Sequence, residues 1–441
     1  MKYLKLNLLS AAFVCGGLLS GCSSPTETAT DDPYFTADED QGGLTLGDGF
    51  QSYVIAEDLG RARHLAVREN GDIYVNLREA NDQGGIAALR DTDGDGRADE
   101  IEYFSDFGGT GMAFYDGNLY ASNDSTIFRY SFVGDNLLPE NAEAPDTIVS
   151  GLPVQTAHAA KSFTFDDKGY LYVNVGAPSN ACQEQDRTRD SPAMDPCPLL
   201  ERHGGVWRFD ASKVGQTQLE DGHRFSTGIR NAVALQFNPL DGHVYAVQHG
   251  RDMLNGLFPD MYTVEESVEQ PAEEMFRLSD GADFGWPYCY FDAAQNKRVT
   301  SPEYGGDKQS TDRCEGTEGP IATFPAHMAP NDLLFYTGDQ FPESYKGAAL
   351  IAFHGSWNRA PLGQKGYFVA IQPFENGDPA GEYQNLAEGF AGVETIEAPS
   401  DAKHRPTGLA MAPDGTVIVS DSVTGKIWRV YYKEDKTMAL K

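Results

Sequence analysis

The feature that most constrains the fold is a short pattern that recurs along the chain. Each copy has a glycine followed by a strand of alternating apolar residues, often with a tyrosine, and most copies follow another apolar strand. Two such strands joined by an Asp-Gly or Asn-Gly turn are typical of a β-hairpin. Strong copies start at Gly71, Gly117, Gly169, Gly242 and Gly415, and a weaker one starts at Gly347.

Six hairpins in a chain of 441 residues predict an all-β fold, a six-bladed β-propeller. Helical periodicity is nearly absent, and insertions after the third, fourth and fifth hairpins account for their uneven spacing. We expect the strand at residues 51–56 to pair with the C-terminal blade and close the ring. The predicted propeller covers residues 44–433, with a tail at residues 434–441. An array of β-sandwiches is the alternative, which the hairpin repeat disfavours.

The N-terminus has the features of a lipoprotein signal. Two lysines precede an apolar run at residues 6–19, and a Leu-Ser-Gly-Cys sequence ends at Cys22. We expect removal of residues 1–21, lipidation of Cys22 and a flexible acidic tether at residues 22–43. An ordinary cleaved signal is the alternative, which the tight Leu-x-Gly-Cys spacing disfavours. Ser23 resembles the sorting signal of Gram-negative outer-membrane lipoproteins, so we predict anchoring in the cell envelope on its periplasmic or surface face.

Four cysteines remain in the predicted mature chain besides Cys22. An even number in an oxidising compartment indicates disulfides. Proximity along the chain favours the pairs Cys182–Cys197 and Cys289–Cys314, each of which would close a long loop. No CxxC or CxxCH motif is present, which argues against a zinc site and against covalent haem.

The chain is strongly acidic, with 34 basic against 66 acidic residues and a net charge of −32. This charge argues against nucleic acid as a partner. Cations and histidines nevertheless recur where the blades are expected to meet the central axis. They are Arg61, Arg63, His158, Lys161, Arg230, His249, Arg251, His354, Arg359, Lys365, His404 and Arg405. Cations that converge on an axis predict an anionic ligand or a developing negative charge.

Residues 353–359, FHGSWNR, form the densest cluster of chemically active side chains. They follow an apolar run at residues 348–352 that is expected to be a strand. Trp and Arg offer flat faces for stacking, while Arg and Asn offer forked donors for carboxylates and carbonyls. The cluster suits a planar, multiply anionic ligand. A capped strand end with one packed tryptophan is the alternative.

These motifs resemble the glucose/sorbosone dehydrogenase family, six-bladed propellers that use pyrroloquinoline quinone (PQQ), and most of all its sorbosone and pyranose dehydrogenase branch. The resemblance covers residues 44–432. It is carried by His158, residues 172–176, residues 228–231 (GIRN), residues 284–287 (FGWP), residues 354–359 and the Arg405-Pro406 pair. It implies oxidation of a small sugar or sugar-derived aldehyde, such as sorbosone or an aldose. Hydride would pass to the quinone and electrons to an external acceptor.

The resemblance also implies residue roles. His158 matches the general base that takes a proton from the substrate hydroxyl; a purely structural histidine is the alternative. The implied PQQ-binding residues are Arg230, Asn231, Trp357, Arg359, Lys365 and Arg405. A calcium ion against the quinone would take backbone carbonyls from Gly250 and Arg251. The family has a Gly-Pro pair there, so the chain departs from it at Arg251.

A second calcium signal lies at residues 91–102, DTDGDGRADEIE. Acidic residues occupy loop positions 1, 3, 5, 9 and 12, and glycine occupies position 6, as in an EF-hand loop. The predicted ligands are Asp91, Asp93, Asp95, Arg97 through its carbonyl, Asp99 and Glu102. Flanking helices are not expected between blades one and two, so a structural calcium site is favoured over a sensor. An acidic turn without metal is the alternative.

Two other functions stay open. A propeller lactonase-type hydrolase would need acids and amides around a metal at the inner strand ends, where this chain has Arg, Lys and His. A non-catalytic binding propeller would need neither His158 nor a ring of cations. Both are disfavoured by the same basic residues.

Overall fold

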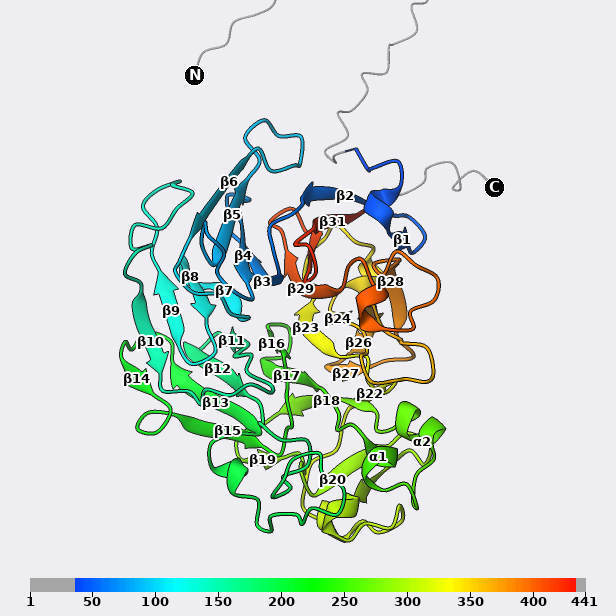
Figure 1. The fold of residues 1–441 in the computed structure, drawn as a ribbon. Helices are drawn as coiled ribbons and strands as arrows, with labels where there is room; N and C mark the ends of the chain where they lie inside the picture. Colours follow the sequence, from blue (N-terminus) through cyan, green and yellow to red (C-terminus); the bar gives the residue numbers. More distant parts are fainter. Residues whose placement is uncertain (1–35, 434–441) are drawn as a thin grey trace, which may run out of the picture. The chain divides into compact units, whose positions relative to one another are not determined.

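The computed structural model describes residues 36–433. Six sheets of four or five strands lie around a central axis, one for each predicted hairpin, which confirms the six-bladed β-propeller (Figure 1). The predicted lipidation site Cys22, the tether up to residue 35 and the tail at residues 434–441 lie outside the described residues. Within residues 36–433, no helix has the length and apolar character needed to cross a membrane.

Each blade is a mainly antiparallel sheet whose first strand lies nearest the axis. Blade 1 contains β3 (Ala62–Val67), β4 (Ile73–Leu77), β5 (Ile86–Arg90) and β6 (Glu100–Phe104). Blade 2 contains β7 (Met112–Tyr115), β8 (Asn118–Ser122), β9 (Ile127–Tyr130), β10 (Asp146–Ser150) and β14 (Gln216–Thr217). Blade 3 contains β11 (Phe163–Phe165), β12 (Tyr170–Val175), β13 (Gly205–Asp210), β15 (His223–Thr227) and β19 (Ala282–Asp283).

The second half of the ring repeats this plan. Blade 4 contains β16 (Ala234–Asn238), β17 (His243–Gln248), β18 (Glu273–Leu278) and β22 (Ala322–Phe324). Blade 5 contains β23 (Pro330–Phe335), β24 (Ala349–Phe353), β25 (Phe368–Gln372), β28 (Gln384–Glu388) and β1 (Thr45–Leu46). Blade 6 contains β29 (Pro406–Met411), β30 (Val417–Asp421), β31 (Ile427–Tyr432) and β2 (Phe50–Ala56).

The remaining elements lie in the connections. Two short hairpins are formed by β20 (Cys289–Asp292) with β21 (Lys297–Thr300) and by β26 (Phe374–Glu375) with β27 (Asp378–Pro379). The helices are α1 (Leu254–Leu257), α2 (Val264–Glu269) and the 3₁₀ turns Gln41–Gly43, Pro198–Glu201, Pro302–Tyr304, Asp312–Cys314, Glu343–Tyr345 and Pro399–Asp401. Both predicted disulfides, Cys182–Cys197 and Cys289–Cys314, are confirmed.

The ring closes as predicted, because β2 pairs antiparallel with β31 from the other end of the chain. This pairing completes blade 6 as a four-stranded sheet, with β2 as its outer strand. Residues 36–43 differ from the prediction of a free tether, since they pack on the propeller. The indole of Trp428 donates to the carbonyl of Gly42 (3.0 Å), where φ is +63° and a Cβ would lie 2.9 Å from that indole. Asp38 forms an ion pair with Arg97 (2.7 Å).

The tyrosines of the repeat join neighbouring blades. Tyr74 of blade 1 is fully buried and donates its hydroxyl to the carbonyl of Leu137, beyond blade 2 strand β9 (2.7 Å). Tyr245 of blade 4 does the same with Gly377 of the β26–β27 turn (3.0 Å). A tyrosine at this position fills the gap between two sheets with an apolar ring while its hydroxyl remains hydrogen-bonded. The repeat therefore encodes the packing between blades as well as the hairpins.

Candidate active site at the propeller axis

The strand order explains why distant residues gather at one end of the axis. Successive strands of a blade run in opposite directions, so the start of the first strand and the end of the second lie at the same face. His158 and Arg230 precede the first strands β11 and β16, whereas His249 and His354 follow the second strands β17 and β24. The insertions after the second strands of blades 3, 4 and 5, residues 176–204, 249–272 and 354–367, leave the blades at this same face.

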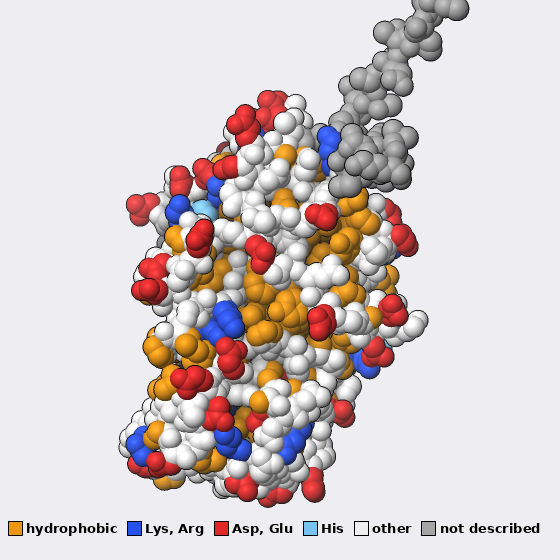
Figure 2. Space-filling model, turned by 90° about the vertical axis from the view of Figure 1, so that its right-hand side faces the viewer, with side chains coloured by type: hydrophobic (Ala, Val, Ile, Leu, Met, Phe, Trp, Pro, Cys, Tyr) orange, Lys and Arg blue, Asp and Glu red, His pale blue; other side chains and the backbone are white. Residues whose placement is uncertain are grey.

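The cations at the axis contrast with the acidic outer surface. Figure 2 shows Asp and Glu side chains scattered over one side of the molecule, with fewer Lys and Arg between them. Near the axis, by contrast, the charges of Arg63 and Arg230 both lower the pKa of His249, although burial contributes more. These arginines come from blades 1 and 4, so the positive charges converge across the ring, as predicted.

His158 has the geometry of a neutral base. Its Nδ1 lies 2.5 Å from the carbonyl oxygen of Ala177 and must donate to it, because that oxygen only accepts. The proton on Nδ1 leaves Nε2 with a lone pair. Burial, reinforced by the charge of Arg230, lowers the pKa of His158 well below 6.5. The imidazole therefore stays neutral near pH 7 and can accept a proton at Nε2.

Asn231 lies beside this histidine. A Cβ at Gly176 would lie 2.6 Å from Asn231 Oδ1 and 2.8 Å from His158 Cβ, so only glycine fits between them. The amide oxygen of Asn231 accepts from Asn174 (3.3 Å), and its carbonyl accepts from the backbone of His249 (2.8 Å). The structure thus brings the predicted base and the predicted ring-binding amide together.

Arg230 is buried in a cage of acceptors. Its Nη1 donates to the carbonyl of Gly250 (2.9 Å), and its Nη2 donates to Asn180 Oδ1 and to Asp252 Oδ2 (3.1 Å each). Burial tends to raise the pKa of Asp252, but the charges of Arg230 and Arg187 outweigh it and hold that pKa below its ordinary value. The cage fixes the guanidinium in one direction. Sequence reasoning missed Asn180 and Arg187, which no local signal marks. It did not assign a role to Asp252, although this residue directly follows the predicted pair Gly250 and Arg251.

Arg405 and Arg63 lie on the other side of the axis with far fewer protein partners. Arg405 donates to the carbonyls of His354 (3.0 Å) and Gly355 (2.6 Å) and has no carboxylate within ion-pair distance among residues 36–433. The guanidinium of Arg63 makes no hydrogen bond or ion pair within that same range, and its Nε is buried. Burial and the charges of Arg78, Arg61 and Arg405 lower the pKa of Arg63 to about 10. Such a cation favours an anionic ligand.

The residues of the FHGSWNR segment differ in their surroundings: some are exposed at the rim of the axial site, and others are buried and hold neighbouring elements together. Trp357 is 57% exposed. Lys365 is half exposed and pairs with Glu269 (3.3 Å). Arg359 differs from its prediction, because its donors are used by the carbonyl of Val268 (2.7 Å) and by Glu269 (2.5 Å) at the end of α2. The segment therefore ends in an arginine that holds α2 against blade 5, and the predicted carboxylate-binding role of Arg359 is not supported.

The predicted axial calcium ligands Gly250 and Arg251 lie at the turn after β17. The carbonyl of Gly250 accepts from Arg230, and its N–H donates to Glu273 (2.6 Å), whose pKa burial raises to about 7. The guanidinium of Arg251 forms a buried ion pair with Glu303 (2.7 Å). Among the described residues, the one cluster of three metal-ligating side chains lies in the acidic loop at residues 91–102, away from the axis. An axial calcium would therefore need backbone carbonyls and oxygens of the bound ligand.

The acidic loop at residues 91–102 holds the cluster of carboxylates. Carboxylate oxygens of Asp91, Asp93 and Asp99 lie within 4.8 Å of one another. Asp95 and Glu102 do not join this group. Asp95 accepts from the backbone of Arg97 (2.8 Å), and Glu102 lies in β6. The loop continues into a strand instead of a helix, which explains why its last predicted ligand lies apart. The structure thus brings together three of the predicted ligands.

Comparison with known proteins gives one family and several relatives. The sequence model of the TrAA12-like family matches residues 44–433. A pyrroloquinoline quinone-dependent pyranose dehydrogenase of Coprinopsis cinerea is 26% identical over 264 residues, which cover 50% of this chain and 33% of that protein. A pyrroloquinoline quinone-dependent sugar dehydrogenase of Hypocrea jecorina is 21% identical over 346 residues, 72% of each chain. An uncharacterized protein of Borreliella burgdorferi is 28% identical over 210 residues, 47% of this chain and 48% of that one.

Solved structures share the fold. The holo form of the pyranose dehydrogenase PQQ domain from Coprinopsis cinerea has a TM-score of 0.68 and 18% identity, covering 88% of this chain and 97% of that one. The calcium structure of the Trichoderma reesei family AA12 enzyme has a TM-score of 0.69 and 18% identity, covering 91% and 99%. At these identities the likeness shows the fold alone. The chain spans a third of the Coprinopsis protein's full length and about half of the Borreliella protein's.

Proposed function

The chain belongs to the TrAA12-like family over residues 44–433, and from that premise we propose that it is a PQQ-dependent dehydrogenase that oxidises a sugar. Two of its relatives are a pyrroloquinoline quinone-dependent pyranose dehydrogenase and a pyrroloquinoline quinone-dependent sugar dehydrogenase. The observation that carries the proposal is the positive charge at the axis, where Arg63 and Arg405 have no carboxylate partner among residues 36–433. A dehydrogenase with a tricarboxylate cofactor accounts for this charge.

The donors at the axis fit PQQ, a planar quinone with three carboxylates. In the proposal Arg230 and Arg405 bind carboxylates, and Asn231 binds the ring system. Trp357 and Lys365 line the rim, where an exposed indole and an ammonium group suit a flat anion. Arg359 is left out because Val268 and Glu269 use its donors.

His158 acts as the base in this proposal. When bound, PQQ supplies a quinone that accepts a hydride from the substrate carbon. His158 takes the hydroxyl proton of that carbon at Nε2, because its Nδ1 is held by Ala177. The charge of Arg230 disfavours the protonated imidazole, so His158 releases the proton readily afterwards. Electrons then pass to an external acceptor.

The substrate is proposed as an aldose or a hydrated sugar aldehyde of the sorbosone type. Both present a hydroxyl on the carbon that loses hydride, so the same base serves both. Calcium belongs to the proposal at two places, at the carbonyls of Gly250 and Arg251 and in the loop at residues 91–102. A relative from Trichoderma reesei has been solved as a calcium structure. At the loop, the support is the cluster of Asp91, Asp93 and Asp99.

We also propose that the enzyme is attached to the cell envelope through lipid on Cys22, in the outer membrane of a Gram-negative bacterium. The support is the lipobox sequence and the disulfides, which suit an oxidising compartment. Membrane contact is through this anchor only, and nucleic acid is not a partner. Mass spectrometry of the native N-terminus should find diacylated Cys22. An unmodified N-terminus at Ser23 or later would contradict the anchor.

A substrate panel tests the activity. The purified protein is mixed with sugars, sugar aldehydes and an artificial electron acceptor, with and without added PQQ and calcium. We expect reduction of the acceptor only when PQQ and an oxidisable sugar are both present. Lactone hydrolysis that needs a divalent metal but no PQQ would instead support the hydrolase. Failure to bind PQQ, together with binding of an unreacted ligand, would support a non-catalytic propeller.

A further inference from the structure

We propose that Asn180 is a positioning residue that holds Arg230 in place for the cofactor. The inference rests on the proposed function, in which Arg230 binds a carboxylate of PQQ. Asn180 comes from the insertion of blade 3, whereas Arg230 begins blade 4. Its side chain therefore acts on the site from a neighbouring blade.

The side chain of Asn180 is fully buried, and all its polar groups are used. Oδ1 accepts from Arg230 Nη2 (3.1 Å) and from the backbone N–H of Asp252 (2.9 Å). Nδ2 donates to the carbonyl of Asp252 (2.9 Å). One amide thus fixes both the guanidinium and the segment that carries its carboxylate partner.

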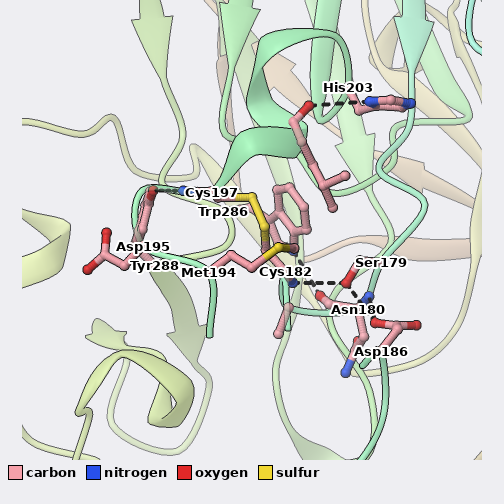
Figure 3. Close-up of a disulfide and its surroundings, with 12 residues drawn as sticks. Ser179, Asn180, Cys182, Asp186, Met194, Asp195, Cys197, His203, Trp286 and Tyr288 are labelled. Atoms are coloured by element: carbon pink, nitrogen blue, oxygen red, sulfur yellow. Dashed lines mark hydrogen bonds between the residues drawn. A yellow bond between two sulfur atoms is a disulfide. The ribbon is translucent and has the colours of Figure 1, made fainter. Parts of the chain in front are cut away.

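The backbone of Asn180 is held from two further directions (Figure 3). Its N–H donates to Asp186 Oδ1 (2.7 Å), which also accepts from the hydroxyl of Ser179 (2.6 Å). Its carbonyl accepts from the indole of Trp286 (2.9 Å). Trp286 belongs to the FGWP motif, which the proposed chemistry does not otherwise use. The motif gains a role here, because it fixes the carbonyl of Asn180.

The disulfide Cys182–Cys197 closes the loop that carries these contacts. The N–H of Cys182 donates to the hydroxyl of Ser179 (2.9 Å), one residue before Asn180. Arg187 of the same loop reaches Asp252 (3.2 Å), which also accepts from Arg230. This part of the chain therefore places two side chains near Arg230: the amide of Asn180 and the cation of Arg187.

The chemistry of an amide explains why asparagine suits this place. A carboxylate would hold Arg230 more strongly but would cancel the charge that an anionic ligand needs. The neutral oxygen of Asn180 fixes the direction of the guanidinium and leaves its charge in place. Asp252, the one carboxylate on Arg230, is shared with Arg187. Positioning without neutralisation is the function that we assign to Asn180.

The test is a double-mutant cycle on PQQ binding to the calcium-loaded apo-protein. Asn180→Ala should weaken PQQ binding by about tenfold, the effect of losing one hydrogen bond to a charged group. Gln183→Ala is the matched control, because Gln183 is buried in the same loop and bonds only the loop carbonyls of Thr188 and Ser191. It should leave PQQ affinity within about twofold of the wild type, the range of a change remote from the ligand.

The decisive comparison adds Arg230→Ala. If Asn180 acts through Arg230, Asn180→Ala should cause no further loss of PQQ affinity in the Arg230→Ala background. Additive losses would overturn the inference, because they would show a general effect on the loop. Trp286→Phe is the second variant should Asn180→Ala fail to fold. It removes the hydrogen bond to the Asn180 carbonyl, together with part of the ring that packs on Ala177, Cys182 and Cys197. Its loss of PQQ affinity should be smaller and should also disappear without Arg230.

A second double-mutant cycle, measured as the melting temperature of the apo-protein, separates this inference from the proposed function. Asn180→Ala and Arg230→Ala should lower the melting temperature by less together than the sum of their single effects, because each removes the same contact. This result needs no PQQ. If the wild type does not bind PQQ, the proposed function is wrong, while non-additivity would still support the contact. Additive effects on the melting temperature would overturn the contact itself.

Discussion

The two sides of the axis hold their arginines in opposite ways. On the side of blades 3 and 4, Arg230 is enclosed by Asn180, Asp252 and the carbonyl of Gly250. On the side of blades 1 and 6, the guanidinium of Arg63 makes no hydrogen bond or ion pair within the described part of the chain, and the guanidinium of Arg405 donates only to carbonyls. On the first side, both terminal nitrogens of the guanidinium have protein partners, although Arg230 Nε is buried without one. On the second side, neither guanidinium forms an ion pair with a carboxylate among residues 36–433, so an anionic ligand would balance their charge.

The difference indicates a division of labour. A caged guanidinium is preorganised, so it binds an anion without first being ordered. An uncompensated cation raises the free energy of the apo-protein, and an anionic ligand relieves that cost. We therefore expect arginines on both sides to contribute to affinity for the cofactor. The caged side, which also carries His158, should in addition govern orientation, catalysis and part of the stability of the apo-protein, whereas the open side should not stabilise the apo-protein.

The largest expected effect concerns His158, on the caged side. His158→Ala should keep PQQ, which the arginines bind, but should lower kcat by about 10²–10⁴-fold, the contribution of a positioned general base. Near-normal turnover with bound PQQ would place the base elsewhere, with His354 as the next candidate. PQQ content, measured by absorbance of the same samples, is the control.

The pH profile tests the electrostatics of the same histidine. Because burial and Arg230 lower the pKa of His158, it remains neutral and active below pH 6.5. The acid limb of kcat/KM should therefore lie below 6.5, and activity should fall only as the pH drops through the lowered pKa. Arg230→Gln, measured at saturating PQQ, should move this limb to higher pH. An unchanged limb would show that the two groups are not coupled.

The next largest effect concerns the cage itself. Arg230→Ala leaves Asp252 buried with a single cation and Asn180 Oδ1 without its guanidinium. Breaking a buried pair in this way costs about 3 kcal/mol of unfolding free energy, and PQQ affinity should fall as well. Denaturant unfolding of the apo-protein measures the first effect and cofactor titration the second. Unchanged stability would show that the cage does not depend on Arg230.

The two disulfides give a matched pair. Cys182–Cys197 lies next to Asn180 on the caged side, whereas Cys289–Cys314 closes another loop. Replacing either pair with alanines should cost about 3 kcal/mol of stability, the value for loops of this size. PQQ affinity should fall only in the first variant, because only that loop holds Arg230. Equal losses of affinity in both would argue against a specific role of the loop at residues 179–197.

The fold could be predicted from the sequence because each copy of the repeat encodes a hairpin through residues that are neighbours along the chain. Each hairpin is encoded by about ten consecutive residues. The tyrosine in most copies also packs against the neighbouring blade. The structure also places His158, Arg230 and Arg405 beside the starts of first strands, as the repeat predicts, while their roles toward the cofactor stay predictions. The pairing of β2 with β31 followed from the closed ring.

Contacts between distant segments were not predictable in this way. Asn180 reaches Arg230 across 50 positions and the N–H of Asp252 across 72, and no pattern joins them. Arg359 was assigned to the cofactor because nothing in FHGSWNR shows that Glu269, 90 positions earlier, lies against it. Residues 36–43 were assigned to the tether because their polar composition hides the fit of Gly42 under Trp428. In each case, the two partners come into contact only when the ring of blades is assembled.

The smallest expected effect concerns Arg63, and it separates the two sides most clearly. Arg63→Met removes a cation whose pKa is lowered by burial and by Arg78, Arg61 and Arg405, while keeping most of its apolar volume. PQQ affinity should fall by about tenfold, since a cation that attracts the carboxylates of the cofactor is lost. The apo-protein should be unchanged or more stable, because no carboxylate is left unpaired, in contrast to Arg230→Ala. Cofactor titration and thermal unfolding of both variants make the comparison. If Arg63→Met destabilises the apo-protein as much as Arg230→Ala does, the open side is a structural cage as well, and the division of labour is wrong.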